Sequence, residues 1–262
     1  MKTGLITLLF LVASSAAIAQ PVRICDDEAE WPPYTYYPRV DGKPDKSRLT
    51  GAVVELLDEI FKINEMEYSL KFLPWKRCLN EVYRFGKNRK YEVFTNGSFS
   101  VERTEKYYLS TMIYSTHQGV FYSKKKYPNG VPMQKSSDLN RFALCGVHGY
   151  NYDTYGLAKE KKIDTGAKTL RHALTKISKL RCDLLPNSLE PVYGGVAVGK
   201  YTIPADIASM PIPGMDPTTF HIFVSKSSPR AYELLTKINQ AILILQHNGV
   251  SKKIFDKYFS ER

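Results

Sequence analysis

The segment Asn96-Gly97-Ser98-Phe99-Ser100-Val101-Glu102-Arg103 places small amide and hydroxyl side chains a few residues before an arginine. Ser and Asn donate hydrogen bonds, and a guanidinium can hold both oxygens of a carboxylate. This order of residue types therefore indicates a site for a small carboxylate, with Arg103 as its clamp. The alternative is a surface loop with a solvated arginine, since Asn96-Gly97 is itself a good turn.

The remaining sequence shows no pattern typical of catalysis or of metal binding. It lacks a Gly-x-Ser-x-Gly nucleophile motif and a phosphate-binding glycine-rich loop. The histidines are scattered without metal-ligand spacing at positions His117, His148, His172, His221 and His247. We therefore expect a binding protein with no catalytic residues, no metal and no cofactor.

Strand and helix signals alternate along the first part of the chain. A strand at residues 22–25 leads into an acidic turn and then Trp31-Pro32-Pro33-Tyr34, where the prolines bar a helix. Helical patterns at 51–61 and 74–86 then alternate with strand patterns at 68–73 and 91–95. This order predicts a parallel sheet with right-handed crossovers.

A second α/β series begins after Met112. Strands are expected at 119–123, 142–147 and 182–186, and an amphipathic helix at 170–180. A Pro/Gly-rich stretch at 211–217 interrupts the pattern before a strand at 220–224 and a long helix at 229–246. The length suits either one large domain or two of about 100–150 residues.

The N-terminus has the pattern of a secretory signal peptide at residues 1–19. Lys2 precedes an apolar run from Leu5 to Val12, and Ala17-Ile18-Ala19 is a small-x-small cleavage signal. The apolar run is too short to span a membrane. We therefore expect a mature protein of 243 residues (262 minus 19) outside the cytoplasm.

The mature chain is basic. The formal charge of +11 falls to +10 once Lys2 is removed. Its densest cationic runs are Lys124-Lys125-Lys126 and Lys159 to Lys162, and each lies near acids, tyrosines or loops. We therefore expect a solvated positive face and no binding to nucleic acid.

Four cysteines in an exported chain predict two disulfides. Three pairings are possible, and Cys25–Cys78 with Cys145–Cys182 suits a two-domain chain best. No two cysteines have the close spacing of zinc ligands, so a zinc site is disfavoured.

Several motifs occur in the order found in the family 3 extracellular solute-binding proteins, which the chain resembles. They are Trp31-Pro32-Pro33-Tyr34, Gly51-Ala52-Val53-Val54-Glu55-Leu56-Leu57, Ser100-Val101-Glu102-Arg103, Gly149-Tyr150-Asn151-Tyr152 and the block from Ser225 to Gly249. The Pro74-Trp75-Lys76-Arg77 run is similar to that of a branch with less uniform ligands. The resemblance covers nearly the whole mature chain.

The resemblance implies an α/β, two-lobed periplasmic-binding-protein type II fold, each lobe a mainly parallel sheet flanked by helices. Residues 20–115 and 214–262 would form lobe 1, residues 116–213 lobe 2, and two hinge strands would join them. The lobes would close on a ligand held between them. The family implies a periplasmic monomer that delivers its ligand to an ABC permease in the inner membrane.

The resemblance also assigns candidate ligand-binding residues. Arg103 would clamp the carboxylate, with Ser98 and Asn96 hydrogen-bonding the same end, and Trp31 would cover the ligand's side chain. From lobe 2, a segment that opens a helix would bring further groups to the carboxylate. These groups are Tyr150, Asn151 and Tyr152. Arg77 would meet a second acidic group or lie on the surface.

The chain departs from the family where amino-acid binders place an Asp for the α-ammonium. The sequence there is Pro186-Asn187-Ser188-Leu189-Glu190, so either Glu190 substitutes or the ligand lacks an α-amine. The ligand is thus expected to be a small carboxylate, amino-acid-like. Two alternatives are a dehydratase-like enzyme using Glu190 or His148, and a ligand sensor that docks on a membrane signalling receptor.

Overall fold

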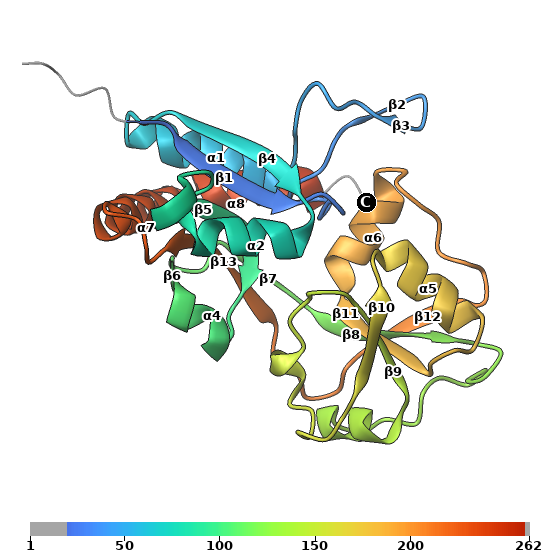
Figure 1. Ribbon diagram of the computed structural model, residues 1–262. Coiled ribbons are helices and arrows are strands. Elements are labelled where there is room, and N and C mark those ends of the chain that lie inside the picture. Colours follow the sequence, from blue (N-terminus) through green and yellow to red (C-terminus); the bar gives the residue numbers. More distant parts are fainter. Residues whose placement is uncertain (1–19, 260–262) are drawn as a thin grey trace, which may run out of the picture.

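The computed structural model describes residues 20–259, and the expected signal peptide at residues 1–19 lies outside that range. The chain forms two lobes, each built on one β-sheet with helices against it (Figure 1). Within the described residues, no helix has both the length and the apolar character needed to cross a membrane.

The first sheet has the strand order β4-β1-β5-β13-β6, and β7 also pairs with β13. Its strands are β1 (Val22–Asp27), β4 (Tyr68–Leu73), β5 (Val93–Ser98), β6 (Tyr107–Leu109), β7 (Tyr114–Thr116) and β13 (Thr218–Ser225). β1 is parallel to β4 and β5, whereas β13 is antiparallel to β5. The carboxyl ends of β1 and β5 therefore reach the same edge of the sheet.

Helices cover both faces of this sheet, since successive side chains of a strand point to opposite faces. One face packs Ile24, Val93 and Val224 against α1 (Ala52–Ile63), α7 (Ala231–His247) and α8 (Val250–Phe259). The other packs Cys25, Phe94 and Phe223 against α2 (Trp75–Tyr83). The smaller elements of this lobe are α3 (Phe85–Asn88), α4 (Val101–Lys106) and the hairpin β2 (Arg39–Val40) and β3 (Lys43–Pro44).

The second sheet has the strand order β10-β9-β11-β8-β12. Its strands are β8 (Gln118–Ser123), β9 (Leu144–Val147), β10 (Ile163–Ala167), β11 (Leu184–Ser188) and β12 (Ile207–Pro211). β9, β10 and β11 form a parallel core, and β8 runs antiparallel to β11 and β12. The flanking helices are α5 (Leu170–Ser178) and α6 (Leu189–Ala197), with short 3₁₀ helices η1 (Ser136–Arg141) and η2 (Asp153–Tyr155).

The chain crosses between the two sheets twice. Residue 117 separates β7 in the first sheet from β8 in the second, and residues 212–217 connect β12 back to β13. The boundary expected at 213/214 lies in the second connection, whereas the one expected at 115/116 lies within β7, just before the first.

Two local expectations need correction. Asn96, Gly97 and Ser98 continue strand β5, because they pair with β13 at Phe220 and His221 and so do not form a free loop. The segment 149–152 does not open an α-helix; it leads only into the short 3₁₀ turn η2, and Asn151 Oδ1 accepts from Asp153 N at 3.0 Å.

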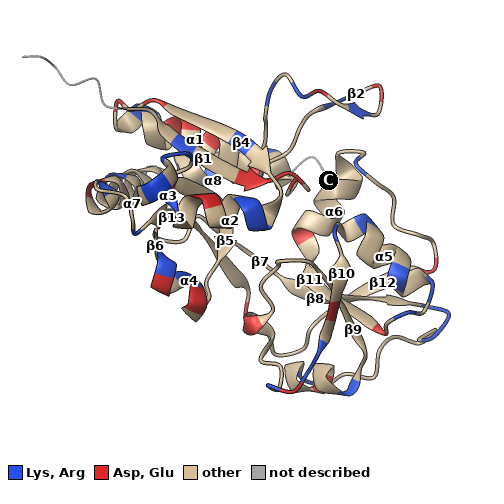
Figure 2. Ribbon diagram, in the orientation of Figure 1, with Lys and Arg blue, Asp and Glu red and all other residues tan. Residues whose placement is uncertain are grey.

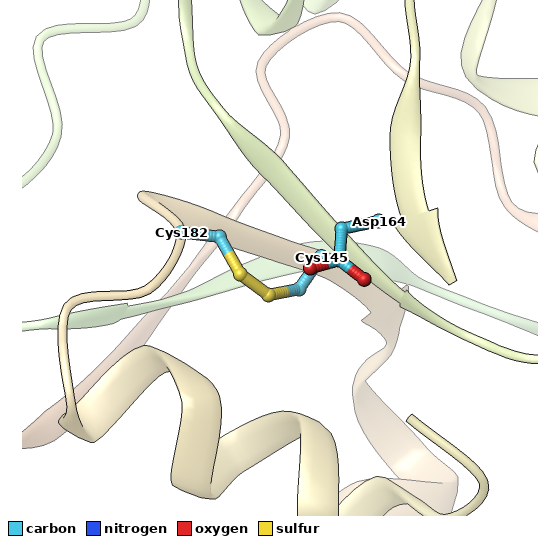
Figure 3. Close-up of side chains that lie close together, drawn as sticks. All are labelled: Cys145, Asp164 and Cys182. Atoms are coloured by element: carbon cyan, nitrogen blue, oxygen red, sulfur yellow. A yellow bond between two sulfur atoms is a disulfide. The ribbon is translucent and has the colours of Figure 1, made fainter. Parts of the chain in front are cut away.

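Both expected disulfides are present. Cys25–Cys78 joins β1 to α2, and Cys145–Cys182 joins β9 to the turn before β11, each with a Cα–Cα distance of 5.7 Å. Asp164 lies beside the second pair (Figure 3). Its carboxylate pairs with the ammonium of Lys176, and the two sulfurs are bonded to each other, so the group presents no thiolate to a metal.

Candidate ligand-binding cavity between the lobes

A cavity lies between the two sheets, at the edge where β1 and β5 end. Its volume is about 70 Å³. Lobe 1 contributes charged and aromatic side chains, and lobe 2 contributes tyrosines, amides and hydroxyls. Ligands of open α/β sheets bind where parallel strands end, so the position is typical of a binding site.

Arg103 lines the cavity from α4. Ser100 caps this short helix by accepting from Arg103 N at 3.2 Å, which fixes where the arginine side chain begins. Its Nη1 donates to Ser98 O at 2.7 Å and to Ser98 Oγ at 3.2 Å, while its guanidinium lies 5.6 Å from the ring centre of Trp75. Nε and Nη2 make no hydrogen bond to any described residue and can therefore receive a carboxylate.

Burial changes the acidity of this arginine. Arg103 is only 9% exposed, and this loss of water lowers the pKa of its guanidinium to about 10. The group still carries a full positive charge at neutral pH. A buried cation with unused donors attracts an anion strongly, because little water competes for it.

Asn96 lines the cavity but is held by protein groups. Its backbone has φ of 56°, a left-handed conformation that Asn tolerates better than most residues. Its Nδ2 donates to Asp26 Oδ2 at 2.6 Å and to Thr35 Oγ1 at 2.9 Å, and its Oδ1 accepts from Tyr114 OH at 2.8 Å. The side chain therefore fixes the positions of Asp26, Thr35 and Tyr114 beside the cavity.

Trp31 also lines the cavity and links it to the first crossing strand. Its Nε1 donates to Tyr114 OH at 3.1 Å. Its ring lies 5.9 Å from Phe220 and 5.6 Å, edge on, from Tyr150 of lobe 2. The indole is thus placed to contact a ligand while touching both lobes.

The acidic side of the cavity was not predicted as a site from the sequence. Asp26 and Asp27 end β1, and both line the cavity. Burial raises the pKa of Asp26 to about 7 and that of Asp27 to about 6, although hydrogen bonds from Thr35 and from Ala29 N oppose these shifts. The available signal was the position of two acids at the carboxyl end of a strand in a parallel sheet.

The three predicted lobe 2 residues all line the cavity and all contact protein groups. Asn151 Nδ2 donates to Ser98 Oγ at 3.1 Å and to Phe99 O at 2.8 Å, both across the lobe interface. Tyr152 OH accepts from Val147 N at 2.6 Å. Tyr150 hydrogen-bonds Asp27, so it too joins the lobes.

Two predicted residues lie away from the cavity. The side chain of Arg77 is 61% exposed, and its Nε lies 3.7 Å from Glu81 Oε1. The two carboxylate oxygens of Glu190 each accept from His117 N at 3.0 Å. In the region of the missing Asp, the cavity is instead lined by Asn187 and Ser188.

Further contacts hold the lobes together beside the acidic turn. The ammonium of Lys200 in lobe 2 donates to Ala29 O and, at 3.3 Å, to Glu30 O. Gly194 of α6 lies so close to lobe 1 that a Cβ there would be 2.3 Å from Pro32 O. The structure is therefore a closed form of the two lobes.

Comparison with known proteins agrees with this architecture. The family model described as bacterial extracellular solute-binding proteins, family 3, matches residues 23–261. The L-cystine-binding protein TcyA of Bacillus subtilis is 22% identical over 89% of this chain and 80% of its own length.

Solved structures show the same fold at low sequence identity. The amino acid ABC transporter substrate-binding protein AbpA of Streptococcus pneumoniae, bound to L-arginine, has a TM-score of 0.70 at 18% identity, over 92% of this chain and 94% of that one. A histidine kinase sensor domain similar to periplasmic binding proteins has a TM-score of 0.69 at 15% identity, over 91% and 96%. The expected two-lobed type II fold is confirmed.

Proposed function

Because the chain belongs to the family 3 extracellular solute-binding proteins of bacteria, we propose that it captures a small amino-acid-like solute in the inter-lobe cavity. It does so in the periplasm, after removal of residues 1–19, and delivers the solute to an ABC permease as a monomer. No cofactor takes part. Closure of the two lobes around the solute is the conformational change that captures it.

The observation that carries this proposal is the pairing of opposite charges in one enclosed cavity. Arg103 offers unused donors to a carboxylate, and the turn at Asp26 and Asp27 offers carboxylates to a cation. A solute with both charges matches both groups at once. A simple carboxylic acid would bring no cation to the acidic turn.

The acidic turn also accounts for the missing Asp of lobe 2. The amine of the ligand binds on the lobe 1 side, at Asp26 and Asp27, whereas Asn187 and Ser188 offer only neutral groups. The named ligands of the relatives, L-cystine and L-arginine, are zwitterions with a second charged or polar end. Compounds of this class are the first to test.

The test is a thermal-shift screen of amino acids, including L-arginine and L-cystine, beside their des-amino and amide analogues. A ligand that binds only the folded state raises its melting temperature by mass action. We expect stabilisation by the zwitterion and a loss of stabilisation with either analogue. Stabilisation by the des-amino acid equal to that by the amino acid would contradict the role of the acidic turn.

Arg103→Ala is expected to weaken binding of the stabilising solute by roughly a hundredfold, since a hydrogen-bonded charge pair contributes about 2–5 kcal/mol. Arg77→Ala is the matched control, because Arg77 lies outside the cavity. Isothermal titration calorimetry measures both. Equal affinities for Arg103→Ala and the parent protein would rule out the clamp.

A sensor function is the second candidate, and the structural likeness to a histidine kinase sensor domain is the observation that favours it. In that case the closed form would dock on a signalling receptor. The dehydratase alternative draws no support from its two candidate residues, because neither Glu190 nor His148 lines the cavity. A pull-down with detergent-solubilised permease would separate import from sensing.

A further inference from the structure

The two lysine-rich runs of the sequence meet at one end of the second sheet. Lys124 follows the carboxyl end of β8, and Lys162 precedes the amino end of β10. These ends coincide because Leu144 pairs with both Ile163 and Leu184, and Leu184 pairs with Tyr122. The cavity lies at the opposite end, where Gln118 and Ser188 line it.

Other turns at the same end add to this charge. The distal basic end consists of residues 124–126, 138–142, 159–162, 179–183 and 204–206. It contains nine Lys and Arg residues against four Asp and Glu residues, a net charge of +5. That is half of the +10 carried by the chain after residue 19. Figure 2 shows basic segments in the outer loops of this lobe.

The acids at this end neutralise only part of its charge. Lys125 pairs with Asp206, Lys126 with Asp183, and Arg141 with Asp138. Five exposed cations have no acidic partner among the described residues. They are Lys124, Lys159, Lys162, Lys179 and Arg181.

An apolar side chain stands among these cations. Leu180, between Lys179 and Arg181, is 49% exposed. Its backbone has φ of 55°, the left-handed conformation that usually favours Gly or Asn at the end of a helix. The turn therefore presents leucine to solvent at a position where other residues would fit more easily.

We propose that the distal basic end docks on an anionic phospholipid bilayer. The loops at the ends of five neighbouring strands, roughly 4.8 Å apart, extend across the whole end of the sheet, which suits a planar charged surface. Several cations beside an exposed apolar side chain are the combination that binds to lipid headgroups. Docking there keeps the receptor at the membrane and leaves the cavity end of the sheet free.

The test is a vesicle flotation assay with the ligand-free mature protein. Vesicles contain phosphatidylglycerol and phosphatidylcholine, or phosphatidylcholine alone. We expect binding only to the anionic vesicles, and its loss in high salt, because exposed charges are screened within about 3 Å at 1 M salt. Binding that is equal on both vesicle types would overturn the proposal.

The triple variant Lys124→Glu, Lys179→Glu and Arg181→Glu is expected to lose at least about tenfold in vesicle affinity. Replacing the same three residues by Gln should give a smaller loss in the same direction. The matched control reverses three exposed cations in and just after the lobe 1 hairpin, Lys43→Glu, Lys46→Glu and Arg48→Glu, and should bind as the parent protein does. Equal losses in the two charge-reversal variants would show a net-charge effect and refute a docking face.

Discussion

At the scale of single residues, the cavity depends on two opposite effects of burial. The guanidinium of Arg103 stays charged because its pKa falls only to about 10. The carboxyl of Asp26, in contrast, has a pKa raised to about 7 and is partly protonated at neutral pH. The cavity therefore holds its cation in the charged form while its acidic side can exchange protons.

This difference predicts an unusual pH dependence for the ligand-free protein. Between the ordinary Asp value of 3.8 and about 7, the folded state keeps the Asp26 proton that the unfolded state has lost. Stability is therefore full at low pH and falls as pH rises through this window. Asp26→Asn should flatten the fall, which we expect to be roughly 2–4 kcal/mol, as measured by urea unfolding from pH 5 to pH 8.

Asp41→Asn serves as the control, because Asp41 is an exposed acid on the lobe 1 hairpin. It should leave the pH profile as in the parent protein. If Asp26→Asn kept the parent's decline between pH 5 and pH 8, another group would be responsible and the assignment to Asp26 would be wrong.

The residue types of the clamp could be predicted from the sequence, but the partners of its neighbours could not. Arg103 lies in the same short segment as Asn96 and Ser98, so the sequence alone places these residue types near one another. The bonds of Asn96 to Asp26 and Tyr114 join positions 70 and 18 residues away, and only the sheet order brings them together. Asp26 and Asp27 were visible as an acidic turn, but their partners come from other segments: Thr35 and Asn96 of lobe 1 bond Asp26, and Tyr150 of lobe 2 bonds Asp27.

At the scale of elements, the two crossings are tied to lobe 1 by stacked aromatic rings. Tyr114 of β7 lies 3.8 Å from Tyr34 and 4.9 Å from Phe220 of β13, with nearly parallel rings. Both strands that connect the lobes therefore move with the same rigid stack. Hinge motion between the lobes is therefore left to the residues outside this stack, which are residue 117 and residues 212–217.

Lys200 makes a contact between the two lobes that should hold the closed form. Its ammonium bonds to Ala29 and Glu30 in lobe 1, it does not line the cavity, and burial lowers its pKa to about 8. Lys200→Met should therefore speed dissociation of every ligand by roughly tenfold, the effect of losing a hydrogen bond from a charged group. Stopped-flow dissociation measures the rate.

Lys168→Met is the matched change at an exposed lysine of the same lobe and should leave the rate unaltered. Selectivity among ligands separates this role from that of the cavity residues, because a latch outside the cavity acts on closure alone. A Lys200→Met protein whose affinity fell for some amino acids and not for others would argue for a direct ligand contact.

The order of strands and helices could be predicted well because each element carries its own periodic pattern, and the disulfide pairs followed from the two-lobe order. The segment 149–152 shows the limit. Its sequence predicts a helix start by resemblance, but Tyr152 packs against Gly146 and accepts from Val147 N, which fixes the segment as an irregular turn. Such a competing tertiary contact cannot be seen in a local pattern.

At the scale of the whole molecule, ligand binding and lobe closure should be visible through intrinsic fluorescence. The sequence contains two tryptophans, Trp31 and Trp75, and both line the cavity. Trp31 touches Tyr150 of lobe 2, whereas Trp75 lies under the Arg103 guanidinium. Opening the lobes removes the first contact and admits water to both rings.

We therefore expect the Trp75→Phe protein, which retains Trp31, to report closure as a blue shift of its emission when the stabilising amino acid is added. The Trp31→Phe protein, which retains Trp75, should respond mainly to the charge that arrives at Arg103, through a change in intensity. Adding Lys200→Met to the Trp75→Phe protein should reduce the blue shift at a given ligand concentration, because fewer molecules are closed. An unchanged emission of Trp31 at saturating ligand would mean that the ring does not sense the lobe interface, and that binding does not close the cavity over it.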